Sequence, residues 1–373
     1  MAKLLMITGL GSAKDLASGK KGAFYNTLEE FHKYWDRIDI IVPRIKNYES
    51  RTTNLFGNVF IHISPWPIIF HPFWFLKKGI EIYKEQKFDL MTVQEFPPFY
   101  NGIGARLLWH KIKVPYILEI HHIPGYPRAA SFKEALYRNL IKWFIKFDAS
   151  KAAAIRVVNH NQTPGFLKRA GVPLDKIIYI SSIYIDLAIF KPMNLEKEHD
   201  IIFVGRLEKN KGIKLLLEAI IHLKLRNLNF KTLVVGDGPL RKEIASKIKK
   251  WDLNIDLYGW AGDSKKIAEL INKSKILVMP SYNEGGPRVV VEALACGLPI
   301  LATAVGIVPD LLKNGQGGEI IAWNEQDISN KAAELLGNED KRKQLGRAGI
   351  EIAKSFERKE AVKNYAEKLK LML

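Results

Sequence analysis

The sequence predicts an α/β protein with two doubly wound domains, each built on a parallel sheet. Short apolar segments rich in Ile and Val alternate with longer amphipathic segments, as strands alternate with helices in such domains. The pattern starts again after about residue 190, and 373 residues are too many for one ordinary hydrophobic core. We therefore predict one domain over 1–192 and a second over 193–354. A charged amphipathic helix over 355–373 is expected to pack back toward the first domain.

Two series of apolar segments are predicted to be strands, and the polar segment Lys191–Asp200 is predicted to link them. Amphipathic segments such as 212–224 and 265–275 are predicted to be helices between strands of the second series. The predicted strands are 3–8, 39–43, 114–120 and 153–158 in the first series, and 200–207, 230–238, 255–260, 275–281, 298–303 and 318–322 in the second.

Composition and charge restrict the classes of function. The chain has a single cysteine, Cys296, so an internal disulfide is impossible and a reducing cytoplasm is expected. The apolar N-terminal stretch is short and runs into glycines, so it resembles a buried strand more than a signal peptide. The formal net charge of +18 favours anionic partners, either phosphorylated metabolites, nucleic acid or a membrane surface. A lysine-rich solvated surface would give the same charge.

The segment Pro280–Ile300 (PSYNEGGPRVVVEALACGLPI) carries two carboxylates in contrasting settings. Glu284 lies among turn-forming residues that follow a buried strand, at the edge where open α/β sheets bind ligands. Glu292 lies in an otherwise uncharged helical stretch, where an ionised carboxylate needs a partner. Two adjacent hydroxyls of a bound sugar would serve, and so would a buried Arg or Lys of the same domain. The helix alone favours the internal ion pair.

The start of that helix is a candidate phosphate site. Pro287 is suited to the first helical position and Gly297 to the C-terminal cap. The free amides and positive dipole end of a helix attract phosphate, and Gly285 and Gly286 allow close approach to the backbone.

Two other strand ends of the second half carry related features. In FVGRLEKNKG, Arg206 follows a strand and Lys211 precedes Gly212, so two cations are available for a diphosphate. An exposed basic turn is the alternative, although Arg206 adjoins an apolar strand. VVGDGPL places Gly236 at another strand end, a weak signal by itself.

Taken in order, FVGRL, VVGDGP, YGW and MPSYNEGGPRVVVEALACGLPILAT resemble the nucleotide-sugar-binding half of family 4 glycosyltransferases, the glycosyl transferases group 1. The match is close over residues 200 to about 322 and loose elsewhere. The resemblance implies a GT-B fold, retention of anomeric configuration, and a donor-sugar contact at Glu284. It also implies ribose binding at Glu292 and diphosphate binding at Arg206 and Lys211.

One motif departs from the common family pattern. Many members read Glu-Gly-Phe-Gly where this chain has Glu-Gly-Gly-Pro, and a Glu-Gly-x-Pro version also occurs in the family. Proline removes one amide donor, while Arg288 adds a cation beside the phosphate. The residues that the resemblance assigns to donor binding are Glu292, Gly285, Gly286, Arg288, Val289, Gly236, Gly259 and Trp260.

The first half resembles the family more weakly. His121, at the end of VPYILEIHH, matches an active-site histidine near the donor sugar, with His122 as the rival and a structural histidine as the alternative. Neighbouring residues supply no third ligand at a metal-binding spacing. In the first strand–helix connection Gly19 and Gly22 are candidates to line the cleft, and this loop matches neither a dinucleotide fingerprint nor a P-loop. Asp186, Phe190 and Pro192 resemble the family's domain-closing motif.

Two aromatic stretches have uncertain roles. Ser64–Lys78 combines Trp, Phe and Pro with lysines, and could dock on anionic lipid or line the acceptor site. Phe132–Phe147 has helical spacing with Lys or Arg every four or five residues. Because it is apolar nearly all round, we predict a buried helix with a basic edge rather than a membrane helix.

These features predict a hexosyltransferase that moves a sugar from a nucleoside-diphosphate sugar to a hydroxyl of a glycan or lipid-linked acceptor. No metal or other cofactor is expected, since the sequence has no Asp-x-Asp. The protein is expected in the cytoplasm, with a possible anionic membrane surface as partner. The alternatives are a GT-B-fold sugar-nucleotide epimerase and a basic, non-catalytic protein that binds glycan, lipid or nucleic acid. The last is disfavoured for nucleic acid because no binding module is recognisable.

Overall fold

The computed structural model describes every residue except 1, 10–15, 17–21, 46–51, 96 and 98. Contacts divide the chain into two compact units. Unit 1 contains Met1–Ile123, Asn139–Ser182 and Lys359–Leu373, and unit 2 contains Pro124–Arg138 and Ile183–Arg358. This division differs from the sequence-based boundaries in two respects. The change of unit near residue 182 precedes the predicted boundary at 192, and Pro124–Arg138 belongs with unit 2.

Unit 1 is built on a sheet whose described strands follow the order β3-β4-β2-β1-β5-β6-β7-β8. All neighbouring pairs are parallel except β3 with β4, which are antiparallel. From β1 the chain adds strands toward one edge of the sheet, and from β5 it adds them toward the other edge. The switch point of the sheet therefore lies between β1 and β5. The strands are β1 (Lys3–Ile7), β2 (Arg37–Val42), β3 (Thr52–Leu55), β4 (Val59–Ile63), β5 (Leu90–Gln94), β6 (Tyr116–Ile120), β7 (Ala154–Val157) and β8 (Ile177–Tyr179).

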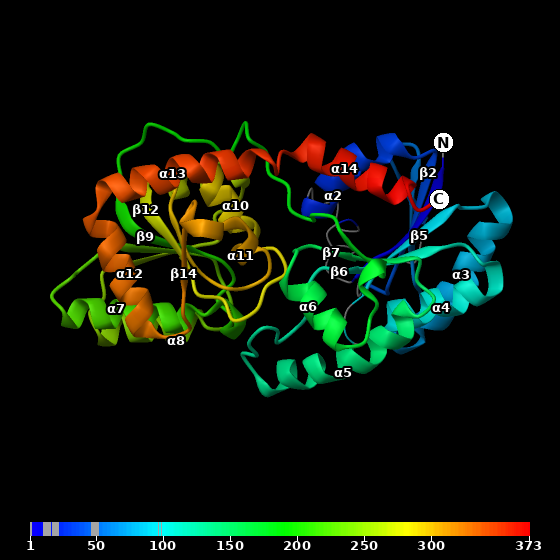
Figure 1. Ribbon diagram of the computed structural model, residues 1–373, viewed down its shortest axis with the longest axis horizontal. Coiled ribbons are helices and arrows are strands. Elements are labelled where there is room, and N and C mark those ends of the chain that lie inside the picture. Colours follow the sequence, from blue (N-terminus) through cyan, green and yellow to red (C-terminus); the bar gives the residue numbers. More distant parts are fainter. Residues whose placement is uncertain (1, 10–15, 17–21, 46–51, 96, 98) are drawn as a thin grey trace. The chain divides into compact units, whose positions relative to one another are not determined.

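Helices cover both faces of this sheet, with α2 and α14 on one side and α3 to α6 on the other (Figure 1). The C-terminal helix α14 contributes Tyr365, whose ring stacks on Phe31 of α2 with 4.8 Å between ring centroids. The helices are α2 (Ala23–Phe31), α3 (His71–Gln86), α4 (Tyr100–Ile112), α5 (Phe132–Ala149), α6 (Gln162–Arg169) and α14 (Arg358–Lys370). The residues of α5 up to Arg138 are assigned to unit 2 and the remainder to unit 1.

Unit 2 has a parallel sheet with the order β11-β10-β9-β12-β13-β14. In chain order this is the 3-2-1-4-5-6 arrangement of a Rossmann fold, whose switch point lies between β9 and β12. Its strands are β9 (His199–Val204), β10 (Thr232–Val235), β11 (Ile255–Gly259), β12 (Ser274–Met279), β13 (Ile300–Thr303) and β14 (Gly318–Ile321).

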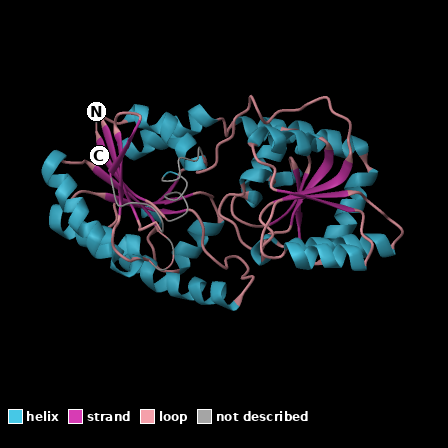
Figure 2. Cartoon of the chain, turned by 180° about the vertical axis from the view of Figure 1, so that it is seen from behind, coloured by secondary structure: helices cyan, strands magenta, loops and turns pink. Residues whose placement is uncertain are grey.

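The helices of unit 2 also lie on both faces of the sheet, as the second view shows most clearly (Figure 2). Asp263, Asn324 and Asn338 each cap a helix, because their side-chain oxygens accept a backbone N–H of the first turn. The helices are α7 (Ile213–Leu225), α8 (Arg241–Lys250), α9 (Ser264–Asn272), α10 (Arg288–Ala295), α11 (Val308–Leu311), α12 (Glu325–Gly337) and α13 (Glu339–Lys354).

Each predicted strand is present, and so are the helices predicted at 212–224, 265–275 and the C-terminus. The sequence analysis missed β3, β4, β5 and β8. The strands β3 and β8 are short, and β5 (LMTVQ) carries polar residues that weaken the apolar pattern.

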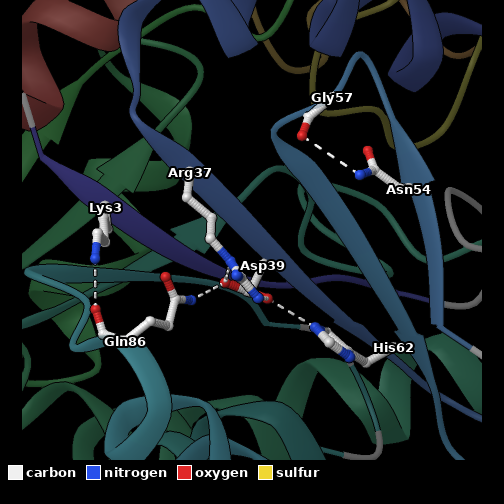
Figure 3. A network of polar contacts seen from close by, with 7 residues as sticks. All are labelled: Lys3, Arg37, Asp39, Asn54, Gly57, His62 and Gln86. Atoms are coloured by element: carbon white, nitrogen blue, oxygen red, sulfur yellow. Dashed lines mark hydrogen bonds and ion pairs between the residues drawn. The ribbon is translucent and has the colours of Figure 1, made fainter.

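The interior of unit 1 includes a buried carboxylate in the middle of β2. Asp39 lies between Arg37, His62 and Gln86, and all three side chains donate to it (Figure 3). The nitrogen–oxygen distances are 2.9 Å from Arg37 Nε and 2.8 Å from His62 Nε2. Burial alone would raise the pKa of Asp39, but the hydrogen bonds from His62 and Arg37 hold it below its ordinary value. This cluster ties β2 to β4 and α3.

Candidate functional site

A pocket of about 350 Å³ opens at the carboxyl ends of β9, β10 and β11 in unit 2. It lies beside the switch point of the sheet, where doubly wound folds bind ligands. Four residues that the sequence analysis selected line it together, namely Arg206, Gly236, Trp260 and Glu292. The other lining residues are Phe190, Val204, Gly205, Val235, Asp237, Ala261, Gly262, Asp263, Ser264 and Ile267.

Glu292 presents a carboxylate to this pocket without a protein partner. It lies in α10 between Val291 and Ala293, which are fully buried. Across the described part of the chain, no side chain makes a hydrogen bond or ion pair with it, so the internal salt bridge favoured from the helix alone is absent. Burial raises the pKa of Glu292 to about 7, and Arg288 opposes this only in part. A ligand with hydroxyl donors would satisfy the group.

Arg206 extends from the end of β9 into solvent at the mouth of the pocket. Its side chain is 70% exposed and forms an ion pair with Glu208, with 3.2 Å between Arg206 Nη1 and Glu208 Oε1. The sequence analysis considered an exposed position unsuitable for Arg206 because this residue adjoins an apolar strand, and that expectation was wrong. An exposed pair of this kind is weak, so the guanidinium can turn to an anionic ligand at little cost.

Lys211 and Glu284 are joined to each other. Lys211 Nζ lies 2.5 Å from Glu284 Oε1, and the hydroxyl of Ser281 donates to the same oxygen at 3.0 Å. The two loops that carry them are in backbone contact, because Tyr282 N–H donates to the carbonyl of Asn210 at 2.8 Å. Gly212 adopts a φ of +69°, and a Cβ there would lie 1.9 Å from the carbonyl oxygen of Pro280. Close packing of the loops therefore requires this glycine.

The loop before α10 is held by several groups from distant segments. Thr303 Oγ1 and Trp323 Nε1 both donate to the carbonyl of Ser281, at 2.5 and 2.9 Å. Gly306, which the sequence analysis did not select, has a φ of +55°, and a Cβ there would lie 2.2 Å from Gly285 oxygen. This packing fixes the path of the chain toward Gly286.

The helix α10 begins at Arg288, so Pro287 occupies the N-cap position rather than the first helical position. Its C-terminus ends as predicted, since Gly297 has a φ of +71° and its N–H donates to the carbonyl of Leu294. The guanidinium of Arg288 lies 4.9 Å from the ring centroid of Tyr184. Val289 packs against the core. The pocket is not lined by Arg288, Val289, Gly285 or Gly286.

Glycines and a turn shape the remaining wall of the pocket. Gly236 has a φ of +137°, and a Cβ there would lie 2.0 Å from the carbonyl oxygen of Gly205. Gly259 ends β11 and does not itself line the pocket, whereas the following Trp260 does and is exposed beside the turn Ala261–Ser264. The sequence analysis missed this turn and Asp237 as lining residues, although glycines and Asp after a strand are a recognisable loop signal. Phe190 was selected only for its place in the domain-closing motif.

His121 lies in unit 1, directly after β6. Its Nε2 is 3.7 Å from Oε2 of Glu119, and no hydrogen bond from Nε2 is formed to any described residue. Glu119 itself is fully buried and bonded to Arg156 and Tyr365, each at 2.6 Å. His121 and His122 are both half-buried, and the assignment of His121 to the donor sugar stays a prediction. Gly22 caps the start of α2, and Gly19 lies outside the described residues.

Two kinds of feature are absent from the described residues, namely a cluster of metal ligands and a membrane-spanning helix. These residues contain no cluster of three or more His, Cys, Asp or Glu side chains that could hold a metal ion. None of their helices is long and apolar enough to cross a membrane.

Comparison with known proteins assigns the family. The family model for glycosyl transferases group 1 matches residues 186–352. An uncharacterized glycosyltransferase of Methanocaldococcus jannaschii is 30% identical over 331 residues, which cover 86% of this chain and 87% of the relative. The chain therefore belongs to the group 1 glycosyltransferases, and the resemblance inferred from the motifs is confirmed.

A second relative and a solved structure are also similar to this chain. An α-1,4-N-acetyl-D-galactosaminyltransferase of Campylobacter jejuni, named for an undecaprenol-diphosphate-linked substrate, is 29% identical over 77% of this chain and 75% of its own. The structure of Anabaena HepE with UDP and glucose superimposes with a TM-score of 0.73, at 17% identity, over 99% of this chain and 100% of HepE. The fold is GT-B, as predicted.

Proposed function

We propose that this glycosyltransferase moves a hexose-type sugar from a nucleoside-diphosphate sugar to a hydroxyl of a glycan or lipid-linked acceptor, with retention of configuration and without a metal ion. The observation that carries the proposal is the partnerless carboxylate of Glu292 in the pocket beside the switch point. A ribose offers two adjacent hydroxyls to such a group. The UDP in the HepE structure and the lipid-linked substrate in the name of the Campylobacter relative support the two substrate classes.

Two cations suit the departure of a diphosphate, namely Arg206, which lines the pocket, and Lys211, which does not. In the proposed step, the bond between the sugar's anomeric carbon and the diphosphate oxygen breaks, and a bond from that carbon to the acceptor oxygen forms. The acceptor proton passes to the leaving diphosphate. Arg206 and Lys211 stabilise the negative charge that grows on the leaving oxygens, an electrostatic contribution that is often the largest in catalysis.

The ion pair of Lys211 with Glu284 gives this site a defined ligand-free arrangement. An arriving diphosphate would compete with Glu284 for the ammonium group of Lys211. Glu284 would then be free to accept hydrogen bonds from the donor sugar, while Ser281 continues to hold its carboxylate. We thus expect binding of the diphosphate to prepare the contact with the sugar.

A thermal-shift screen tests the donor class directly. The purified protein is titrated with UDP, GDP, ADP and their sugar conjugates, and we expect one base to raise the midpoint of unfolding at micromolar concentration. If no nucleotide of this set produces a shift, the proposal fails.

Arg206→Ala tests the diphosphate assignment. Loss of one charge-stabilising group is expected to lower kcat about 10²- to 10³-fold in a transfer assay with the donor found by the screen. Thermal stability should be nearly unchanged, because the side chain is exposed and weakly paired. Arg226→Ala is the matched control, since this arginine is exposed in unit 2 and does not line the pocket. Full activity of Arg206→Ala would refute the assignment.

A further inference from the structure

The helix α5 carries a continuous apolar stripe on its exposed side. Five large apolar residues recur at spacings of four, four, three and four positions, which places them within an arc of about 80° on an α-helix. Their exposed fractions are 86% for Phe132, 47% for Leu136, 37% for Leu140, 80% for Trp143 and 48% for Phe147.

The opposite side of α5 is the one that faces the protein. Ile141 and Ile145 are buried there, and Phe144 stacks on Phe99 with 4.5 Å between ring centroids. The stripe is therefore a second apolar face, additional to the face that anchors the helix. The sequence analysis predicted a buried helix, and this prediction was wrong, because apolar residues all round do not show which side the fold covers.

Basic side chains border the stripe. Lys133 flanks it on one side and Lys142 and Lys146 on the other, and all three are exposed. Among the described residues none of these lysines has an ion-pair partner. The two acidic residues of α5 do not offset them, because Asp148 is fully buried and Glu134 is partly buried and accepts hydrogen bonds from Ala130 N–H and Asn283. The exposed surface of α5 is thus apolar and cationic.

We propose that α5 lies in the plane of an anionic membrane surface, with the five stripe residues inserted among the acyl chains and the three lysines on lipid phosphates. An exposed apolar stripe with lysines along its edges and aromatic residues within it is the pattern of an interfacial helix. A second copy of this chain fits less well, because each copy carries a net charge of +18 and the same lysines would face each other. The inference is independent of the proposed donor chemistry.

Sedimentation with vesicles tests the proposal on the full-length protein. We expect the protein to bind vesicles of phosphatidylcholine with phosphatidylglycerol at low salt, and to bind less at 0.5 M salt or without the anionic lipid. Leu136→Ser/Trp143→Ser should weaken the binding at least about tenfold, because two anchors are lost. Leu225→Ser/Trp251→Ser is the matched control, since both residues are exposed in unit 2. It should bind like the unmodified protein.

A second pair of variants distinguishes the effect of the lysines on α5 from the effect of net charge on vesicle binding. Lys133→Glu/Lys142→Glu/Lys146→Glu should weaken binding about 100-fold or more, since each lysine at the surface contributes substantially. Lys242→Glu/Lys249→Glu/Lys250→Glu reaches the same net charge through exposed lysines of α8 and should retain most of the binding. Near-ultraviolet circular dichroism verifies folding of each variant.

Three outcomes would overturn the proposal. The first is no binding to anionic vesicles at low salt. The second is equal loss of binding in the stripe variants and their controls. The third is a dimer, detected by light scattering, that Leu136→Ser/Trp143→Ser dissociates while vesicle binding stays unchanged, since the stripe would then be an interface between copies.

Discussion

Two glutamates, one buried in unit 1 and one half-buried beside the pocket of unit 2, have opposite surroundings. Glu119, on β6 of unit 1, receives hydrogen bonds from Arg156 Nη1 and Tyr365 Oη, each at 2.6 Å. Burial would raise its pKa, but the charge of Arg156, the neighbouring His121 and the hydrogen bond from Tyr365 lower it to about 2. Glu292, on α10 of unit 2, has no such donors among the described residues, and burial raises its pKa to about 7.

The difference separates a carboxylate that supports the fold from one that is available to a ligand. Glu119 joins segments far apart in the chain, since Tyr365 lies on the C-terminal helix and Arg156 lies on β7. Arg156 also donates hydrogen bonds to the carbonyl groups of Ile180 and Ser181. Glu292 contributes nothing comparable and faces a pocket. An ionised carboxylate that is partly withdrawn from water without a partner costs free energy, so such a group at a pocket is a candidate for ligand binding.

The largest effect is expected from breaking the satisfied cluster. Arg156→Met leaves the carboxylate of Glu119 buried without its cation, and should lower the free energy of unfolding by about 3–5 kcal/mol. Urea denaturation of the variant and of Arg226→Met, an exposed control, measures the difference. A loss below about 1 kcal/mol would mean that the cluster does not stabilise unit 1.

Glu292→Gln should have the opposite effect on stability. The folded protein holds the Glu292 proton up to a pKa of about 7, whereas the unfolded chain releases it near 4.5. Stability of the unmodified protein relative to the variant should therefore fall as pH rises from 4.5 through 7, by up to about 3 kcal/mol. Unfolding curves at pH 5 and pH 8 test this, and a difference of opposite sign would contradict it.

The same variant should lose the pH dependence of nucleotide binding. If the ionised Glu292 accepts hydrogen bonds from a ribose, affinity of the unmodified protein should increase as pH rises through 7, by about tenfold. Calorimetric titration with the nucleotide from the screen would detect this. Affinity of Glu292→Gln equal to that of the unmodified protein at pH 8 would exclude the ribose contact.

A smaller loss of stability than that of Arg156→Met is expected for Tyr365→Phe. This variant keeps the ring that stacks on Phe31 and lies 3.9 Å from Arg156 Cζ, and removes only the hydroxyl bonded to Glu119. We expect a loss of about 1.5–3 kcal/mol, the range for a hydrogen bond to a charged group. If urea denaturation gives the same loss as Arg156→Met, the hydroxyl rather than the cation sustains the cluster.

Local sequence patterns were sufficient for much of the fold and part of the site. The strands of unit 2 and the loop Pro280–Gly286 follow from apolar runs and turn residues that lie next to each other in the chain. The same patterns identified Arg206, Gly236 and Glu292, and the family resemblance added Trp260; the structure brings these four residues to one pocket. These patterns gave no indication of Gly306, because this residue does not differ locally from an ordinary turn residue.

By itself the sequence determined the alternation of strands and helices, the restart of that pattern, and which polar residues end the strands, since each depends on near neighbours along the chain. The tertiary structure alone decided that Lys211 pairs with Glu284, that Glu292 has no partner in the described chain, and that the stripe of α5 faces outward. Pairing and exposure depend on distances between segments remote in sequence, and no local period encodes those distances.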